Sequence, residues 1–195
     1  VYFKKVDPLL WAVIKSTGNP PKLPKRRRGD YYTDLVDAIV SQQLSIKTAG
    51  TIFNRLKTLF KDGKIATLAT LRLNDEKIRA AGMSYSKIKY IKDLATKVQN
   101  GEIDLKVLGA LPDEEVIAEL IRVKGIGRWT AEMFLIFSLN RQDVFSHGDL
   151  GLTSAIKKIY KIKKYSHAEV EKIVSIWSPY KSYASLVLWR SLDNK

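Results

Sequence analysis

Two glycines on either side of one apolar residue form the clearest binding signal in this sequence. The stretch Lys124-Gly125-Ile126-Gly127-Arg128 lies between two segments of helical composition. Because glycine lacks a Cβ, the backbone can approach a partner closely, and amides at the start of the next helix can point at a phosphate oxygen. Ile126 would anchor the turn inward, while Lys124 and Arg128 add positive charge. These residues alone are weak evidence, because most such turns only end one helix and begin another.

The composition favours an anionic partner. Lys and Arg number 34 against 20 Asp and Glu, which gives a formal net charge of +14. Such an excess suits nucleic acid or an anionic membrane surface, although a solvated lysine-rich surface would produce the same value. The basic segment 20–29, PPKLPKRRRG, is expected to be an exposed connection, with a phosphate contact or nuclear import as the alternative.

The lack of cysteine and the small number of histidines exclude several kinds of metal and redox site. With no cysteine, the chain has no disulfide, thiolate zinc site or iron–sulfur cluster, and two separated histidines make a histidine metal site unexpected. Any reaction would use carboxylates, hydroxyls, aromatic rings or backbone groups, without a catalytic metal. No apolar run reaches the roughly 18 residues of a membrane span, so the chain is expected to be intracellular and to avoid membranes.

The elements that must position these groups are predicted to be helices. Glycine and proline divide the sequence into helical lengths, with little of the alternation that is typical of strands, which predicts an all-α fold. Asp34 is the expected cap of a helix over 35–44, whose apolar pattern continues to Phe60 and should end at Gly63.

Four later segments also have helical patterns. The segment 129–139 is apolar nearly all round and is expected to form a central buried helix. The other three are short and amphipathic, at 75–81, 86–99 and 112–123.

Several motifs in a fixed order match one protein family. The glycine pair is followed by the segment 143–152, DVFSHGDLGL. This order resembles the helix-hairpin-helix (HhH-GPD) DNA glycosylase superfamily and is most similar to its DNA-3-methyladenine glycosylase II branch. The other motifs that carry the resemblance are Ser41 to Ser45, Leu71-Arg72, Arg79 to Gly82, Lys87, Tyr90, and Trp177 to Ala184 with Trp189.

The resemblance implies a base excision repair enzyme that flips an alkylated purine out of duplex DNA and hydrolyses its N-glycosidic bond. It assigns catalysis to Asp149, because a carboxylate stabilises the positive charge that develops on the sugar and can orient water. From local sequence alone, Asp149 is as readily the N-cap of a helix. Family members that also cut the backbone have a lysine after Gly-Arg, where this chain has Trp129, which implies no lyase activity.

The resemblance also assigns residues to the DNA and to the base. Leu44 is the candidate wedge that fills the gap left by the flipped base, with an ordinary core leucine as the alternative. Trp129, Trp189 and Met133 are expected to line the base pocket, where aromatic faces attract a cationic purine. The residues expected to bind DNA are Gln42, Gln43, Leu44, Ser45, Lys124, Gly125, Ile126, Gly127, Arg128 and Thr130.

The same resemblance suggests two helical lobes with the active site in the cleft between them. The expected boundaries are 35–138 for a central barrel and 1–34 plus 139–195 for the second lobe. The only cofactor it suggests is a structural Na⁺ or K⁺ on the backbone carbonyls of Val123 and Ile126, and a monomer is expected. His147 is interpreted as an exposed loop histidine or a DNA contact, and Trp177 as a packed core residue.

Three functional alternatives remain at this stage. A damage sensor could use the same fold without catalysis, and another glycosylase branch could act on oxidised or mismatched bases. A basic helical scaffold that binds protein or membrane is a third interpretation, and it would show no preference for damaged duplexes. The compartment depends on the source, being cytoplasmic for a prokaryote and nuclear for a eukaryote.

Overall fold

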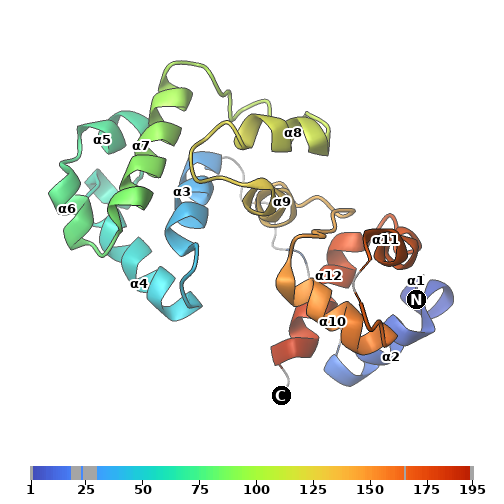
Figure 1. Ribbon diagram of the computed structural model, residues 1–195. Helices are drawn as coiled ribbons and strands as arrows, with labels where there is room; N and C mark the ends of the chain where they lie inside the picture. The colour runs from blue at the N-terminus through green and yellow to red at the C-terminus, as the bar shows by residue number, and fades with distance from the viewer. Residues whose placement is uncertain (1, 19–22, 24–29, 165, 194–195) are drawn as a thin grey trace. The chain divides into compact units, whose positions relative to one another are not determined.

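The computed structural model describes residues 2–18, 23, 30–164 and 166–193, and these residues form helices joined by loops and turns, without a strand (Figure 1). The all-α prediction is therefore confirmed. Within the described residues, no helix has the length and hydropathy that crossing a membrane requires. In chain order the helices are α1 (Tyr2–Val6), α2 (Pro8–Thr17), α3 (Tyr31–Ser41), α4 (Ile46–Lys57), the 3-10 helix η1 (Lys61–Gly63), α5 (Thr67–Arg72), α6 (Asp75–Ala80), α7 (Tyr85–Gln99), α8 (Asp113–Leu120), α9 (Arg128–Phe137), α10 (Leu150–Tyr160), α11 (His167–Ser175) and α12 (Lys181–Asp193).

The chain divides into two compact units. The central unit comprises Arg27–Phe134, and the terminal unit comprises Val1–Arg26 together with Leu135–Lys195. The boundary at Leu135 falls within α9. Most of the basic segment 20–29 lies outside the described residues, and its one described member, Leu23, is buried.

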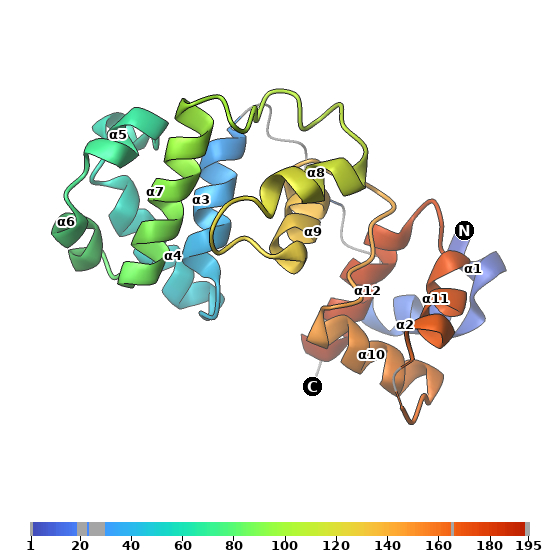
Figure 2. The same cartoon turned by 45° about the horizontal axis from the view of Figure 1, so that its top comes forward.

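The central unit is built around α3 and α7, which lie side by side in both views (Figure 2). Fully buried aliphatic side chains on each helix form its core, because they recur at the helical spacing that brings them to one face. These side chains are Leu35, Val36, Ile39 and Val40 on α3, and Ile88, Ile91 and Leu94 on α7.

The predicted long helix from residue 35 to 60 is wrong, because two caps divide it. Asp30, not Asp34, begins α3, since its Oδ1 accepts the amide of Thr33 at 3.0 Å. The chain leaves the helical region at Gln42, whose ψ is 131°. Ser45 then caps α4 by accepting the amide of Thr48 at 3.2 Å, and α4 ends at Lys57, before Gly63.

The terminal unit packs around Trp177, which is fully buried as expected. Its indole N–H donates to Oδ2 of the buried Asp7 at 2.8 Å, and the hydroxyl of Tyr160 donates to the same oxygen at 2.5 Å. Asp7 also caps α2, because its Oδ1 accepts the amides of Leu9 and Leu10. Burial, and then the bond to Asp7, raise the pKa of the Tyr160 phenol.

This network predicts that Asp7→Ala lowers the free energy of unfolding by about 3 kcal/mol, because it removes a helix cap and leaves buried donors without an acceptor. Asp30→Ala is the matched control: it removes an exposed cap and should cost about 1 kcal/mol. Urea unfolding followed by circular dichroism measures both. Equal losses in the two variants would show that the buried contacts of Asp7 contribute nothing beyond capping.

Candidate functional site

The turn between α8 and α9 uses its two glycines differently. Gly125 has a φ of +81°, and a Cβ there would lie 2.1 Å from Cδ2 of Tyr90, so the tyrosine ring of α7 leaves room only for glycine. A Cβ at Gly127 would meet no atom within 4 Å, which leaves open space in front of that backbone. Ile126 is buried, as the sequence predicted. The turn is thus packed on one side and accessible at Gly127.

Neighbouring helices hold this turn by polar contacts. The Asp93 carboxylate on α7 accepts the backbone amide of Lys124 at 2.9 Å. Gln42, at the end of α3, donates its amide to the carbonyl of Gly125 at 2.8 Å and reaches the hydroxyl of the buried Thr130 at 3.5 Å. The side chains of Gln42 and Thr130, both assigned to DNA from the sequence, therefore support the turn from within the protein.

The two charged residues beside the turn differ in their pairing. Arg128 makes a two-pronged ion pair with Glu114 and a further one with Glu132, at N···O distances of 2.5 to 3.0 Å. The bond from Arg128 lowers the pKa of the Glu114 carboxyl, and the same bond raises the pKa of Arg128. Lys124 is 76% exposed and lies 4.0 Å from Asp93. Most of the accessible positive charge at this turn thus comes from Lys124.

Two aliphatic side chains are exposed at the link between α3 and α4, which comprises residues 42–45, and at the start of α4. Leu44 is 38% exposed and Ile46 is 94% exposed, on either side of the capping residue Ser45. Gln43, with a φ of 57°, is exposed as well. The sequence drew attention to Leu44 but not to Ile46, although an isoleucine directly after a serine cap lies in the first turn, where its side chain can point outward.

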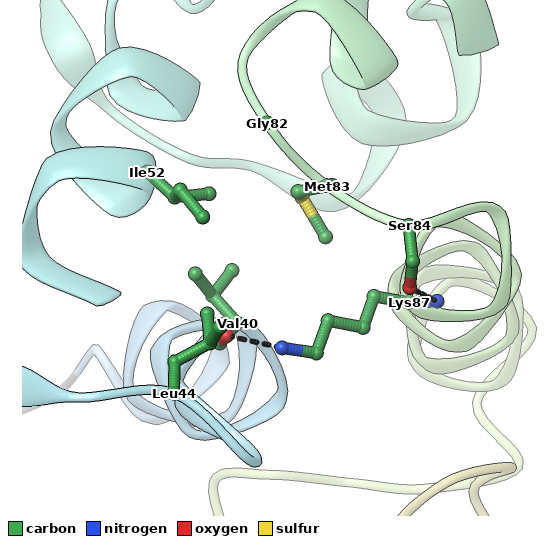
Figure 3. Close-up of a pocket in the computed structure, with 7 residues that line it drawn as sticks. All are labelled: Val40, Leu44, Ile52, Gly82, Met83, Ser84 and Lys87. Carbon is green, nitrogen blue, oxygen red and sulfur yellow. Dashed lines mark hydrogen bonds between the residues drawn. The ribbon is translucent and has the colours of Figure 1, made fainter. Parts of the chain in front are cut away.

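Leu44 is neither fully buried nor free of neighbours. It lines a pocket of about 110 Å³ beneath the link, shown in Figure 3. In this pocket the ammonium of Lys87 donates to the carbonyls of Val40 and Gln42, each at 2.7 Å, and burial lowers its pKa. Lys87 therefore satisfies the carbonyl end of α3. The pocket is lined by Val40, Leu44, Ile52, Gly82, Met83, Ser84 and Lys87.

Asp149 in the terminal unit is a helix N-cap, which was one of the two roles that the sequence left open. It is buried, and its Oδ1 accepts the amide of Leu152 at 2.7 Å, so it caps α10. The indole N–H of Trp189 on α12 donates to the same oxygen at 3.0 Å. Gly151 permits this contact, because a Cβ there would lie 3.1 Å from Oδ1 of Asp149 and 3.3 Å from Cδ1 of Trp189. Sequence reasoning missed this role of Gly151.

The predicted aromatic residues fall into two groups. In the terminal unit, Trp189 stacks on Phe137, with ring centroids 5.9 Å apart and 29° between the planes. In the central unit, Trp129 and Met133 lie four residues apart on one face of α9, with Trp129 44% exposed. The prediction that α9 is buried all round is therefore wrong at Trp129 and Phe137. Both rings are therefore partly exposed.

His147 is not an exposed loop residue. Its side chain is 24% exposed, and its Nε2 lies 2.9 Å from Oε2 of Glu171 on α11. The interpretation as a merely exposed histidine is therefore wrong, because the loop before α10 packs its side chain against α11.

Comparisons with known proteins agree on one family. Residues 36–179 match the model of the HhH-GPD superfamily of base excision DNA repair proteins. The chain is 36% identical to DNA-3-methyladenine glycosylase 1 of Schizosaccharomyces pombe, covering 98% of this chain and 85% of that protein. It is 34% identical to a putative DNA-3-methyladenine glycosylase of Bacillus subtilis, covering 83% of this chain and 59% of the relative.

Solved structures have the same fold. The 3-methyladenine DNA glycosylase Mag1 of Schizosaccharomyces pombe, in complex with abasic DNA, has a TM-score of 0.86 at 33% identity, covering 96% of this chain and 93% of that one. A DNA-3-methyladenine glycosidase from Bacillus halodurans has a TM-score of 0.84 at 34% identity, covering 99% and 88%.

The two glycines of the turn should respond in opposite ways to the same change. Gly125→Ala should destabilise the protein by about 2 kcal/mol or more, because it places a side chain at positive φ and against the Tyr90 ring. Gly127→Ala should change the free energy of unfolding by less than about 0.5 kcal/mol. Thermal unfolding of both variants measures the difference, and equal stabilities would contradict the close packing at Gly125.

Gly151→Ala should weaken the hydrogen bond between Trp189 and Asp149, because the new methyl group must displace one of them by a few tenths of an ångström. We expect the indole proton of Trp189 to move upfield in the proton–nitrogen NMR spectrum, where Trp189→Phe identifies the signal. Gly148→Ala is the control, since a Cβ there meets nothing within 4 Å. An unmoved Trp189 signal in Gly151→Ala would show that the site adapts without loss.

Proposed function

The chain belongs to the HhH-GPD superfamily of base excision DNA repair proteins, and we propose that it is a DNA glycosylase that removes alkylated purines of the 3-methyladenine type from duplex DNA by hydrolysis. The observation that carries this proposal is the buried carboxylate of Asp149, held at the start of α10 by the Leu152 amide and the Trp189 indole. A carboxylate fixed in this way suits a reaction in which positive charge develops on a neighbouring sugar.

The proposed reaction breaks the bond between C1′ of the deoxyribose and the purine nitrogen. The electron pair of that bond leaves with the base, and a cationic alkylated purine departs as a neutral molecule. Water then bonds to C1′ and loses a proton, which the Asp149 carboxylate can accept. The two hydrogen bonds to Oδ1 orient the carboxylate, and the N-terminal dipole of α10 favours its negative charge.

Partly exposed aromatic rings suit the proposed substrate. An alkylated purine that carries positive charge is attracted to the faces of tryptophan rings, by about 0.5 to 2 kcal/mol per contact. Trp189, supported by Phe137, and Trp129, with Met133 beside it on α9, offer such faces. These contacts would favour the damaged base over its neutral counterpart.

We further propose that the enzyme has no lyase activity. Trp129 follows Gly127-Arg128, where the lyases of this family have a lysine, and an indole cannot form the Schiff base that strand cleavage requires. The product would be an abasic site in an intact strand.

The remaining partners follow from the same proposal. Gly127 and Lys124 would contact a DNA phosphate, with Leu44 or Ile46 entering the duplex.

A structural Na⁺ or K⁺ would bind the carbonyls of Val123 and Ile126. The Val123 carbonyl accepts the amide of Ile126 at 3.1 Å and has a second lone pair for a cation. We propose a monomer that acts inside the cell, in the cytoplasm of a prokaryote or the nucleus of a eukaryote.

The test is the release of free bases from methylated duplex DNA by the unchanged protein and by Asp149→Asn, with strand breaks scored before and after alkali. Asparagine caps a helix as well as aspartate does, so the variant removes the charge and keeps the fold. We expect base release to fall at least about 100-fold in Asp149→Asn, and breaks to appear only after alkali.

Asp30→Asn is the matched control, because it removes the charge of another helix cap, on α3, and should leave base release unchanged. A protein that releases no base but binds abasic duplex tightly would instead be a damage sensor. Breaks without alkali would contradict the absence of lyase activity.

A further inference from the structure

The two histidines of the chain, far apart in the sequence, lie side by side in the terminal unit. The ring centroids of His147 and His167 are 4.1 Å apart, with 44° between the planes. The carboxylate of Glu171 pairs with the first of them, since its Oε2 lies 2.9 Å from Nε2 of His147. One ligand atom from each of the three residues lies within 4.8 Å of the other two. The cluster makes no use of Asp149.

Two separate elements supply these groups. His167 is the first residue of α11, and Glu171 lies four residues later, so both side chains occupy one face of the helix. His147 comes from the loop before α10, where its ring packs edge-on against Phe145, with centroids 4.9 Å apart. A helical pair at this spacing with a third ligand from another element is a common arrangement in metal sites.

We propose that His147, His167 and Glu171 bind a divalent transition metal ion of the Zn²⁺ class, with water completing the coordination. Imidazole nitrogen with one carboxylate oxygen is a donor set for Zn²⁺, Ni²⁺ or Cu²⁺, whereas Mg²⁺ and Ca²⁺ prefer oxygen ligands. Neighbouring ligand atoms in a tetrahedral zinc site are about 3.3 Å apart, given metal–ligand distances of about 2.0 to 2.1 Å. Nε2 of His147 and Oε2 of Glu171 are 2.9 Å apart, and the three ligand atoms all lie within 4.8 Å of one another, so small side-chain rotations would form the site.

The bound ion would support the catalytic carboxylate without contacting the substrate. His147 lies two residues before Asp149, and the amide of Asp149 donates to the carbonyl of the buried Ser146 at 3.2 Å. A metal that links His147 to α11 therefore fixes the loop leading to the start of α10. We infer that this is a structural site that limits the movement of that loop.

The experiment is titration calorimetry of the chain without an affinity tag at pH 7.5, with ZnCl₂ as the probe and MgCl₂ for comparison. We expect one equivalent of Zn²⁺ and no heat from Mg²⁺. His167→Gln, His147→Gln and Glu171→Gln should each weaken Zn²⁺ binding at least about tenfold. Glu169→Gln is the matched control, because it removes the same charge from an exposed position on the same helix and should bind as the unchanged protein does.

Two further measurements do not depend on base release, so their result is separate from that of the proposed glycosylase activity. Zn²⁺ at 100 times its Kd should raise the melting temperature by about 5 °C or more, and this rise should be absent in His147→Gln. Co²⁺ should give the visible absorption of a four-coordinate site. Binding of equal strength in the unchanged protein and both histidine variants, or no binding at all, would overturn the proposal and leave a histidine–carboxylate hydrogen bond.

Discussion

The geometry of the candidate site depends on one carboxylate oxygen that accepts two hydrogen bonds. Oδ1 of Asp149 receives the amide of Leu152 and the indole N–H of Trp189, and so joins the start of α10 to α12. Glycine at position 151 allows that approach, because a Cβ there would lie 3.1 Å from Oδ1 of Asp149 and would require a small shift. In the segment 149–152, Asp-Leu-Gly-Leu, the glycine therefore gives the indole of Trp189 access to the aspartate.

In the terminal unit, two aspartates each cap a helix and also accept an indole N–H. Asp7 caps α2 with one oxygen and accepts the indole of Trp177 with the other, while Asp149 caps α10 and accepts the indole of Trp189. The environments differ, because Trp177 is fully buried whereas Trp189 is partly exposed and stacks on Phe137. The same pairing thus lies in the core at Asp7, whereas at Asp149 it involves a partly exposed indole.

In the central unit, side chains of the neighbouring helices hold the turn between α8 and α9, while the backbone at Gly127 stays accessible. Tyr90 fills the space beside Gly125, Asp93 accepts the amide of Lys124, and Gln42 donates to the Gly125 carbonyl. These contacts fix the backbone without using the amide side of Gly127. A turn that is already fixed would lose little conformational entropy on binding a ligand, which is the physical advantage of supporting it from within the protein.

The amino-acid sequence by itself determined the all-α fold, the family and the glycine turn, because these depend on local spacing and on motifs in a fixed order. It also drew attention to Asp149 as a candidate residue. It also indicated the helices near 75–81 and 86–99 from their apolar pattern. It did not reveal that Asp30 caps α3, that Arg128 is paired with Glu114 and Glu132, or that Gln42 supports the turn.

Only the tertiary structure decided those points, together with the role of Gly151 and the meeting of His147, His167 and Glu171. Most of them depend on which side chain of another segment lies a few ångströms away, whereas the Asp30 cap and the Arg128–Glu132 pair join residues three and four positions apart. Helical periodicity specifies the face on which a residue lies, but it contains no information about the element that packs against that face.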